Sequence, residues 1–143
     1  MPWKLVGSLS LRMQPKSENV SQVEFKTCPL YIESAKSHSI NNPIIAEKLK
    51  EFRATKQSNP IQNFGSKDYS MGANAPIGRA VPKIRHAHLT QDLSIFYVVE
   101  GRNPTLFKLY GVFSHAESGT GTPANIKRQQ NFGKQLSHQV FTE

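Results

Sequence analysis

Three runs of alternating apolar and polar residues form the clearest pattern in the chain. They cover residues 83–89, 93–99 and 105–115. Such alternation is typical of a β-strand that buries one face. The short segments 90–92 and 101–104 separate the runs and contain residues that favour turns. We therefore expect three consecutive antiparallel strands joined by two hairpin turns.

Pairing these strands sorts their side chains onto two faces. Opposed residues of an antiparallel pair point to the same side, and we place Ala87 opposite Ile95 and Tyr97 opposite Phe107. One face is then apolar and suited to packing under helices: Ala87, Leu89, Leu93, Ile95, Tyr97, Val99, Phe107, Leu109 and Phe113. The other face has polar and aromatic side chains: His86, His88, Ser94, Phe96, Lys108, Tyr110 and Ser114. A register slip of one residue would exchange the two faces.

Two helices are expected on either side of these strands in the sequence. In residues 42–57, Ile45, Leu49 and Phe52 recur at the spacing i, i+4, i+7. This spacing places the three side chains in one stripe that can be buried against a sheet. The second helix is expected over residues 123–141, where a threonine and a proline provide the start signals.

The remaining segments are less regular. Residues 3–13 alternate like a strand, and residues 22–26 predict a short strand that ends before Pro29. Residues 30–40 fit either the end of a strand or a helical turn. Residues 58–82 are rich in Asn, Gly, Pro and Ser and predict a long loop. Loops of more than about 12–15 residues in a compact domain are often functional.

The composition points to polyanionic partners. The chain has 143 residues, which suggests one domain, and 18 Lys and Arg against 10 Asp and Glu give a net charge of +8. An excess of positive charge favours nucleic acid, the ribosome or an acidic protein, although a basic surface alone is also compatible with an ordinary soluble protein.

Cys28 is the single cysteine, so no internal disulfide can form and a reducing cytoplasm fits. No apolar run approaches the roughly 20 residues needed to span a bilayer, so no membrane association is expected.

His86 and His88 are expected side by side on the polar face, and three interpretations are open. They can be a solvated or hydrogen-bonded pair. They can be metal ligands, but this would require further ligands such as His115 and Glu117, and the spacing is not a recognised zinc pattern. They can also bind RNA or cleave it.

RNA cleavage by side chains alone needs the residue types found on this face. A base takes the proton of the 2′-OH, which attacks the adjacent phosphate, and an acid protonates the leaving 5′-oxygen. Histidine suits either role near neutral pH. Lysine and arginine can hold the phosphate, and Phe96 and Tyr110 can stack on unpaired bases. Ordinary core packing is the alternative role of these two aromatic rings.

The order of the segments resembles the RelE/ParE toxin superfamily, and most closely the YafO-type toxins of bacterial type II toxin–antitoxin systems. The likeness covers about residues 22–140. No single motif is diagnostic, and the order and spacing of the segments make the case. The similar segments are Val23-Glu-Phe-Lys-Thr27, Leu49-Lys-Glu-Phe-Arg-Ala-Thr-Lys56, Pro60, Phe64-Gly-Ser-Lys-Asp-Tyr69, Arg85-His-Ala-His-Leu89, Ile95-Phe-Tyr-Val, Asn125-Ile-Lys and Gly133-Lys.

The resemblance implies a fold and a function. The implied fold is α+β, with a RelE-like antiparallel sheet packed against helices on one face and a C-terminal helix. Residues 22–143 would form the toxin domain, and residues 1–21 an N-terminal extension or an extra strand. The implied function is that of a cytoplasmic, ribosome-dependent mRNA interferase, which is an endoribonuclease that cleaves mRNA in the ribosomal A site, beside rRNA, and inhibits translation. A cognate antitoxin protein would inhibit it, and no metal or other cofactor is expected.

The expected site combines this resemblance with the predicted polar face. We assign His88 and His115 as the proton-transfer pair. The residues expected to bind RNA are Lys83, Arg85, His86, Phe96, Lys108 and Tyr110.

The chain departs from the family pattern at two places, and two other functions are open. Ser94 stands where many RelE-like enzymes have an arginine before the central strand. His115-Ala-Glu117 stands where some relatives have a His-Tyr pair. The alternatives to a nuclease are a ParE-like toxin that poisons gyrase without cleaving RNA, and a non-catalytic module that binds RNA or the ribosome.

Overall fold

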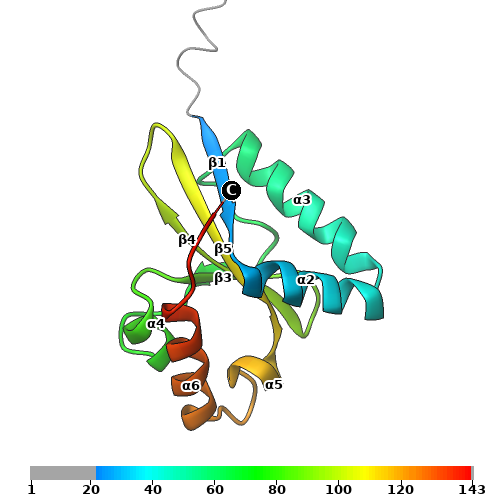
Figure 1. Ribbon diagram of the computed structural model, residues 1–143. Helices are drawn as coiled ribbons and strands as arrows, with labels where there is room; N and C mark the ends of the chain where they lie inside the picture. Colours follow the sequence, from blue (N-terminus) through cyan, green and yellow to red (C-terminus); the bar gives the residue numbers. More distant parts are fainter. Residues whose placement is uncertain (1–21, 143) are drawn as a thin grey trace, which may run out of the picture.

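The computed structural model describes residues 22–142, which form an α+β fold around one five-stranded mixed sheet (Figure 1). The strand predicted over residues 3–13, and with it the role of residues 1–21, lies outside the described part. The elements are β1 (Val23–Thr27), α2 (Pro29–Asn41), α3 (Ile44–Ser58), β2 (Asp68–Ser70), α4 (Pro76–Ala80), β3 (Arg85–His88), β4 (Leu93–Glu100), β5 (Thr105–Ser114), α5 (His115–Ser118) and α6 (Ile126–Ser137). None of the helices within residues 22–142 has the length and apolar character needed to cross a bilayer.

The sheet has the strand order β1-β5-β4-β3-β2. The three predicted strands are confirmed as β3, β4 and β5, and they pair antiparallel in sequence order. The expectation of a wholly antiparallel sheet is wrong, because β1 pairs with β5 in the parallel direction. The chain also returns to β1 near its C-terminal end, where Thr27 and Thr142 exchange two backbone hydrogen bonds of 2.8 Å.

The predicted register holds for the first hairpin and fails for the second. Ala87 lies opposite Ile95, as expected. In the second hairpin Phe107 pairs with Val99, not with Tyr97 as predicted, because the turn between the strands is longer than expected. An irregularity between Phe96 and Tyr97 then shifts the register further. A β-bulge of this kind moves later side chains to the opposite face. Phe113 therefore lies on the face of the histidines, not on the face predicted for it.

The first face of the sheet is covered by α3, with α2 beside it. The stripe Ile45, Leu49 and Phe52 is buried, as its spacing predicted. It packs on sheet residues such as Ile95 and Tyr97 within one hydrophobic cluster. The ambiguous residues 30–40 belong to α2.

The second face of the sheet is covered as well, by α4 and α6. Its hydrophobic cluster consists of Ile77, Val81, Ile84, Phe96, Val98, Tyr110, Phe113, Phe132 and Leu136. Helices therefore lie on both sides of the sheet, and the expectation of helices on one face is wrong (Figure 1). The reason is that the segment predicted as a long loop contains β2 and α4, and α4 provides a surface on which α6 packs.

A buried polar network attaches the short strand β2 to α3. Lys56 donates to a carboxylate oxygen of Asp68 over 2.7 Å, Tyr97 donates to the other oxygen, and the Phe64 N–H donates to the first over 2.8 Å. Burial by itself raises the pKa of Asp68, but these hydrogen bonds and the Lys56 charge outweigh it and lower the pKa below its ordinary value. The network thus holds β2, three residues long, in a fixed position at the edge of the sheet.

Candidate functional site

Strand pairing brings four polar and aromatic side chains onto one face at the β2 edge of the sheet. Tyr69 of β2 lies opposite His86 of β3, and the His88 N–H donates to the Lys67 carbonyl over 2.9 Å. Because alternate residues of a strand point to the same side, Lys67, Tyr69, His86 and His88 share this face. A cation and an aromatic ring are therefore the neighbours of the two histidines.

His115 joins this group from the end of β5. The ring centroids of His88 and His115 are 5.7 Å apart, those of His86 and His88 are 5.5 Å apart, and those of Tyr69 and His86 are 4.7 Å apart. We call His86, His88 and His115 the histidine row. The structure thus brings together the two residues predicted as the proton-transfer pair.

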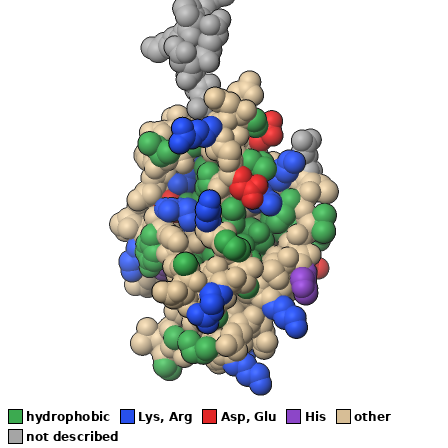
Figure 2. All heavy atoms as spheres, turned by 90° about the vertical axis from the view of Figure 1, so that its left-hand side faces the viewer, with side chains coloured by type: hydrophobic (Ala, Val, Ile, Leu, Met, Phe, Trp, Pro, Cys, Tyr) green, Lys and Arg blue, Asp and Glu red, His purple; other side chains and the backbone are tan. Residues whose placement is uncertain are grey.

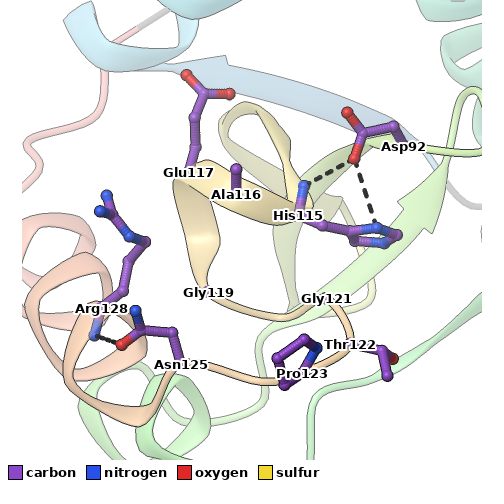
Figure 3. Close-up of a pocket in the computed structure, with 10 residues that line it drawn as sticks. All are labelled: Asp92, His115, Ala116, Glu117, Gly119, Gly121, Thr122, Pro123, Asn125 and Arg128. Carbon is purple, nitrogen blue, oxygen red and sulfur yellow. Dashed lines mark hydrogen bonds and ion pairs between the residues drawn. The ribbon is translucent and has the colours of Figure 1, made fainter.

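The histidine row opens into a pocket of about 520 Å³, which we call the histidine pocket. Its walls come from β2, β3 and the loop between α5 and α6. The lining residues are Lys67, Tyr69, Ser70, Met71, His86, His88, His115, Thr120, Gly121 and Thr122. A second pocket of about 640 Å³ is lined in part by the same loop (Figure 3). It shares His115, Gly121 and Thr122 with the first pocket.

His86 is the buried member of the row. Its side chain packs between the rings of Tyr69 and Phe96, and its Nδ1 has no hydrogen-bond partner within residues 22–142. Burial, together with the neighbouring His88, lowers the pKa of His86 to about 4. His86 is therefore neutral near pH 7 and forms the floor of the pocket.

His88 is half-buried and faces the pocket. Burial is the main cause that lowers its pKa, and the charges of His115 and Lys67 act in the same direction, against a backbone hydrogen bond at Thr90. A lowered pKa keeps the imidazole neutral near pH 7. In this form one ring nitrogen has a free lone pair, which is the requirement for a general base.

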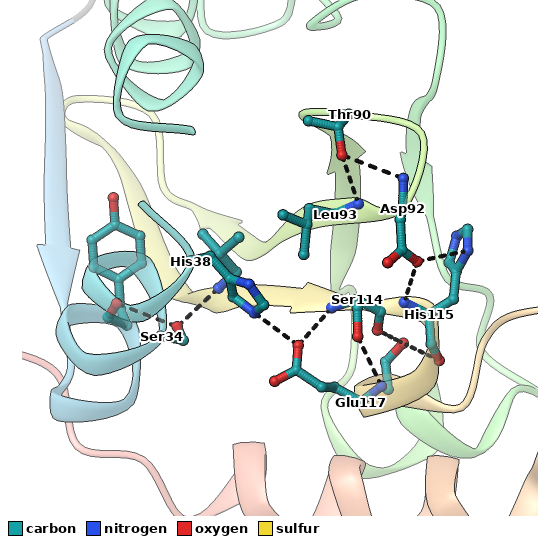
Figure 4. A network of polar contacts seen from close by, with 11 residues as sticks. Ser34, His38, Thr90, Asp92, Leu93, Ser114, His115 and Glu117 are labelled. Atoms are coloured by element: carbon teal, nitrogen blue, oxygen red, sulfur yellow. Dashed lines mark hydrogen bonds and ion pairs between the residues drawn. The ribbon is translucent and has the colours of Figure 1, made fainter. Parts of the chain in front are cut away.

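His115 is oriented by Asp92. The carboxylate of Asp92 accepts from the His115 backbone N–H over 3.1 Å and lies 3.4 Å from the ring Nδ1 (Figures 3 and 4). When the imidazole is protonated, this contact is an ion pair. Because Nδ1 faces the carboxylate, Nε2 is the ring atom left to exchange a proton with a ligand.

Glu117, considered at first as a metal ligand, is engaged elsewhere. Its Oε1 lies 2.8 Å from Nε2 of His38 and accepts from the Ser114 N–H over 2.8 Å (Figure 4). With Ser114 it forms a capping box that starts α5, and this fixes the position of His115. Within the described residues, no three His, Cys, Asp or Glu side chains are placed to hold a metal ion together.

Three of the residues predicted to bind RNA, Phe96, Tyr110 and Arg85, do not line the pocket. Phe96 and Tyr110 are buried under α4 and α6, so their rings cannot stack on bases. Arg85 lies on the opposite face, where it donates to the Tyr97 hydroxyl over 3.1 Å and to the Asp68 carbonyl over 2.8 Å.

The other two predicted cations are accessible but do not line the pocket. Lys108 pairs with Val98 of β4, two residues beyond Phe96, and its amine lies 3.4 Å from Glu100. Lys83 is exposed in the turn before β3. Of the predicted site residues, the pocket therefore contains His86, His88 and His115.

Sequence reasoning missed Lys67, Tyr69 and Asp92. Lys67 and Tyr69 fall in the segment predicted as a loop, and Asp92 in a predicted turn. Lys67, Asp68 and Tyr69 do not alternate between apolar and polar types, and β2 is only three residues long, so the sequence carries no clear strand signal there. The face on which Lys67 and Tyr69 lie becomes visible only from the pairing of β2 with β3.

The excess of positive charge in the sequence is visible on the surface of the molecule. Figure 2 shows one face of the molecule with many Lys and Arg side chains and few acidic ones. Such a surface attracts phosphate groups.

Comparisons with known proteins found no relative. No protein-family model matches the chain, and no curated protein and no solved structure gives a significant match. The resemblance to the RelE/ParE superfamily therefore depends on the sequence segments given above.

Proposed function

We propose that the protein is the toxin of a type II toxin–antitoxin system and acts as a metal-independent endoribonuclease that cleaves mRNA on the ribosome. The observation that supports this best is the contact between His88 and His115, whose rings are 5.7 Å apart in an open pocket. Their surroundings differ as the two proton-transfer roles require. His88 has a lowered pKa, whereas Nδ1 of His115 lies 3.4 Å from the carboxylate of Asp92.

The proposed reaction assigns the two histidines to opposite proton transfers. Neutral His88 takes the proton of the 2′-OH, and the oxygen attacks the adjacent phosphorus. The new O2′–P bond forms as the P–O5′ bond breaks. Protonated His115 gives its proton to the leaving 5′-oxygen, so the products are a 2′,3′-cyclic phosphate and a 5′-hydroxyl. Each proton transfer of this kind typically contributes about 10²–10⁴-fold to the rate.

Lys67 supplies the positive charge that this reaction needs. It is exposed, lies beside His88 in the strand pairing and lines the same pocket. An ammonium group there can hold the phosphate and stabilise the negative charge that grows on its oxygens in the transition state. Lys67 takes the place of Arg85, which the structure turns to the other face.

The test begins with controlled expression in bacteria. Growth should arrest, and primer extension should reveal new 5′ ends within mRNA. A purified sample should then cleave mRNA in the presence of translating ribosomes, and a parallel reaction with naked RNA measures ribosome dependence. Growth arrest with intact mRNA and trapped gyrase would overturn the nuclease proposal in favour of a ParE-like activity. RNA or ribosome binding without cleavage would favour a non-catalytic module.

A further inference from the structure

Tyr69 is a prominent part of the histidine pocket that the proposed proton transfers do not use. Its side chain is 50% exposed, whereas every other Phe and Tyr in residues 22–142 is buried or half-buried. One part of the ring packs on His86 in an edge-to-face arrangement, at 4.7 Å between centroids and 79° between planes. The rest of the ring faces the pocket. An aromatic ring that is exposed in a pocket is available to stack on a ligand.

We infer that Tyr69 is the base-stacking platform of the histidine pocket, and that it holds an unpaired base next to the phosphodiester at His88 and His115. The inference rests on the proposed function, because it assumes that the ligand is RNA. It adds the residue that positions the substrate and the requirement that the nucleotide be single-stranded.

The order of side chains along β2 supports this assignment. Lys67 lies beside His88, and Tyr69 lies beside His86, one pleat further along the same face. The pocket therefore contains a cation, a pair of proton-transfer groups and an aromatic ring on neighbouring positions of the same face. These groups match the parts of one nucleotide: the cation suits the phosphate, the proton-transfer groups suit the ribose hydroxyl, and the aromatic ring suits the base.

The fixed position of the ring favours stacking over loose contact. Asp68, between Lys67 and Tyr69, is held by Lys56 over 2.7 Å on the other face of the sheet, so β2 is anchored. His86 supports the ring from below and is neutral near pH 7. A rigid aromatic ring can stack on any base that has left its partner, whereas a base inside a duplex has both faces covered.

Binding to an uncleavable RNA tests the inference apart from catalysis. The probe is a short, fluorescently labelled single-stranded oligoribonucleotide with 2′-O-methyl groups, which cannot undergo attack by the 2′-oxygen. Tyr69→Ala and Tyr69→Leu should bind it about 5- to 150-fold more weakly than the wild type, because one stacked base is lost. Tyr69→Phe keeps the flat ring and should bind nearly as well as the wild type. Ile61→Ala is the matched control, since this side chain is 88% exposed in a loop and lines none of the pockets described.

An abasic version of the same oligonucleotide separates stacking from charge. It should bind equally to the wild type and to Tyr69→Ala, because the phosphates remain and the bases do not. The thermal unfolding temperature of each variant must match that of the wild type. If Tyr69→Ala is unfolded, Tyr69→Leu replaces it in the test, because leucine keeps an apolar side chain over His86.

The two proposals fail in different ways. Wild-type affinity of Tyr69→Ala and Tyr69→Leu for the probe would overturn the stacking role, even if His88→Ala abolished cleavage. An equal loss of affinity for the abasic probe would overturn it too, because stacking could not be the cause. Conversely, the Tyr69 variants could bind the probe weakly while the wild type cleaves no mRNA on translating ribosomes. That result would support the stacking role of Tyr69 and overturn the nuclease proposal.

Discussion

His88 and His115 have different surroundings although their rings are in contact. Burial keeps His88 neutral, whereas His115 faces the carboxylate of Asp92. We predict that His88→Ala and His115→Ala each lower the rate of mRNA cleavage by about 10²–10⁴-fold, as expected for the loss of one proton-transfer group. The measurement is the rate of appearance of new mRNA ends with translating ribosomes. His138→Ala, which changes an exposed histidine at the end of α6, should cleave at the wild-type rate. Undiminished cleavage in both site variants would remove these residues from the mechanism.

His86 should make the stability of the protein depend on pH. Its pKa is about 4 in the folded protein and 6.5 in its ordinary state. Between these values the unfolded chain binds the extra proton, so folding is favoured at higher pH and the stability falls as the pH drops from 6.5 to 4. The expected loss is at most about 3 kcal/mol.

Urea unfolding at several pH values measures this loss. His86→Leu keeps an apolar body under Tyr69 and cannot be protonated, so its stability should change less with pH in that window than the stability of the wild type. The lowered pKa of Asp68 affects a separate window, below its ordinary value of 3.8. If the free energy of unfolding changed equally with pH in the two proteins between pH 4 and 6.5, the protonation of His86 would not be the cause of the pH dependence.

At the scale of elements, Gly133 shows why a helix signal can mislead. In helix propensity, glycine costs about 1 kcal/mol relative to alanine. In the fold, however, α6 approaches α4 so closely that a Cβ on Gly133 would lie 2.9 Å from the Cβ of Ala80 and 3.2 Å from the Cα of Ile77. The glycine therefore allows the two helices that cover the histidine face to pack together.

We predict that Gly133→Ala lowers the free energy of unfolding by about 1–3 kcal/mol, because crowding in a packed interface outweighs the gain in helix propensity. The matched control is Lys134→Ala, an exposed neighbour in the same helix, which should change the stability by less than about 0.5 kcal/mol. Chemical denaturation measures both. A Gly133→Ala protein that is more stable than the wild type would show that the two helices can move apart at little cost.

The parts of the fold that sequence reasoning found are those with long, regular patterns. The stripe on α3 and the register of Ala87 against Ile95 were predicted, because a spacing or a short turn determines each locally. The second face was not, because β2 has three residues and α4 has five, too few for a periodic signal. The site followed the same rule. The sequence suggested His88 and His115, whereas Lys67 and Tyr69 became visible only through the pairing of β2 with β3.

At the scale of the whole molecule, the net charge of +8 does not by itself determine where the proposed RNA ligand would bind. Charge attracts phosphates from every side, and its effect is screened by salt. The histidine pocket adds a local cation, Lys67, and an aromatic ring, Tyr69, to this general attraction. The two contributions differ in their response to salt, because stacking releases no counterions.

We therefore predict different salt dependences for two variants that both bind RNA more weakly. For single strands, the logarithm of the binding constant falls with the logarithm of the salt concentration with a slope of about −0.7 for each phosphate neutralised. Lys67→Ala should make the slope less steep by about 0.7, while Tyr69→Ala should lower the affinity and leave the slope unchanged. Lys50→Ala removes the same charge from the exposed surface of α3, on the other side of the sheet, and should change neither the affinity nor the slope.

Titrations of the 2′-O-methyl oligonucleotide at several salt concentrations give the slopes of all three variants. Equal slopes for Lys67→Ala and the wild type would mean that RNA phosphates do not contact Lys67, and would overturn its role as the phosphate-binding cation.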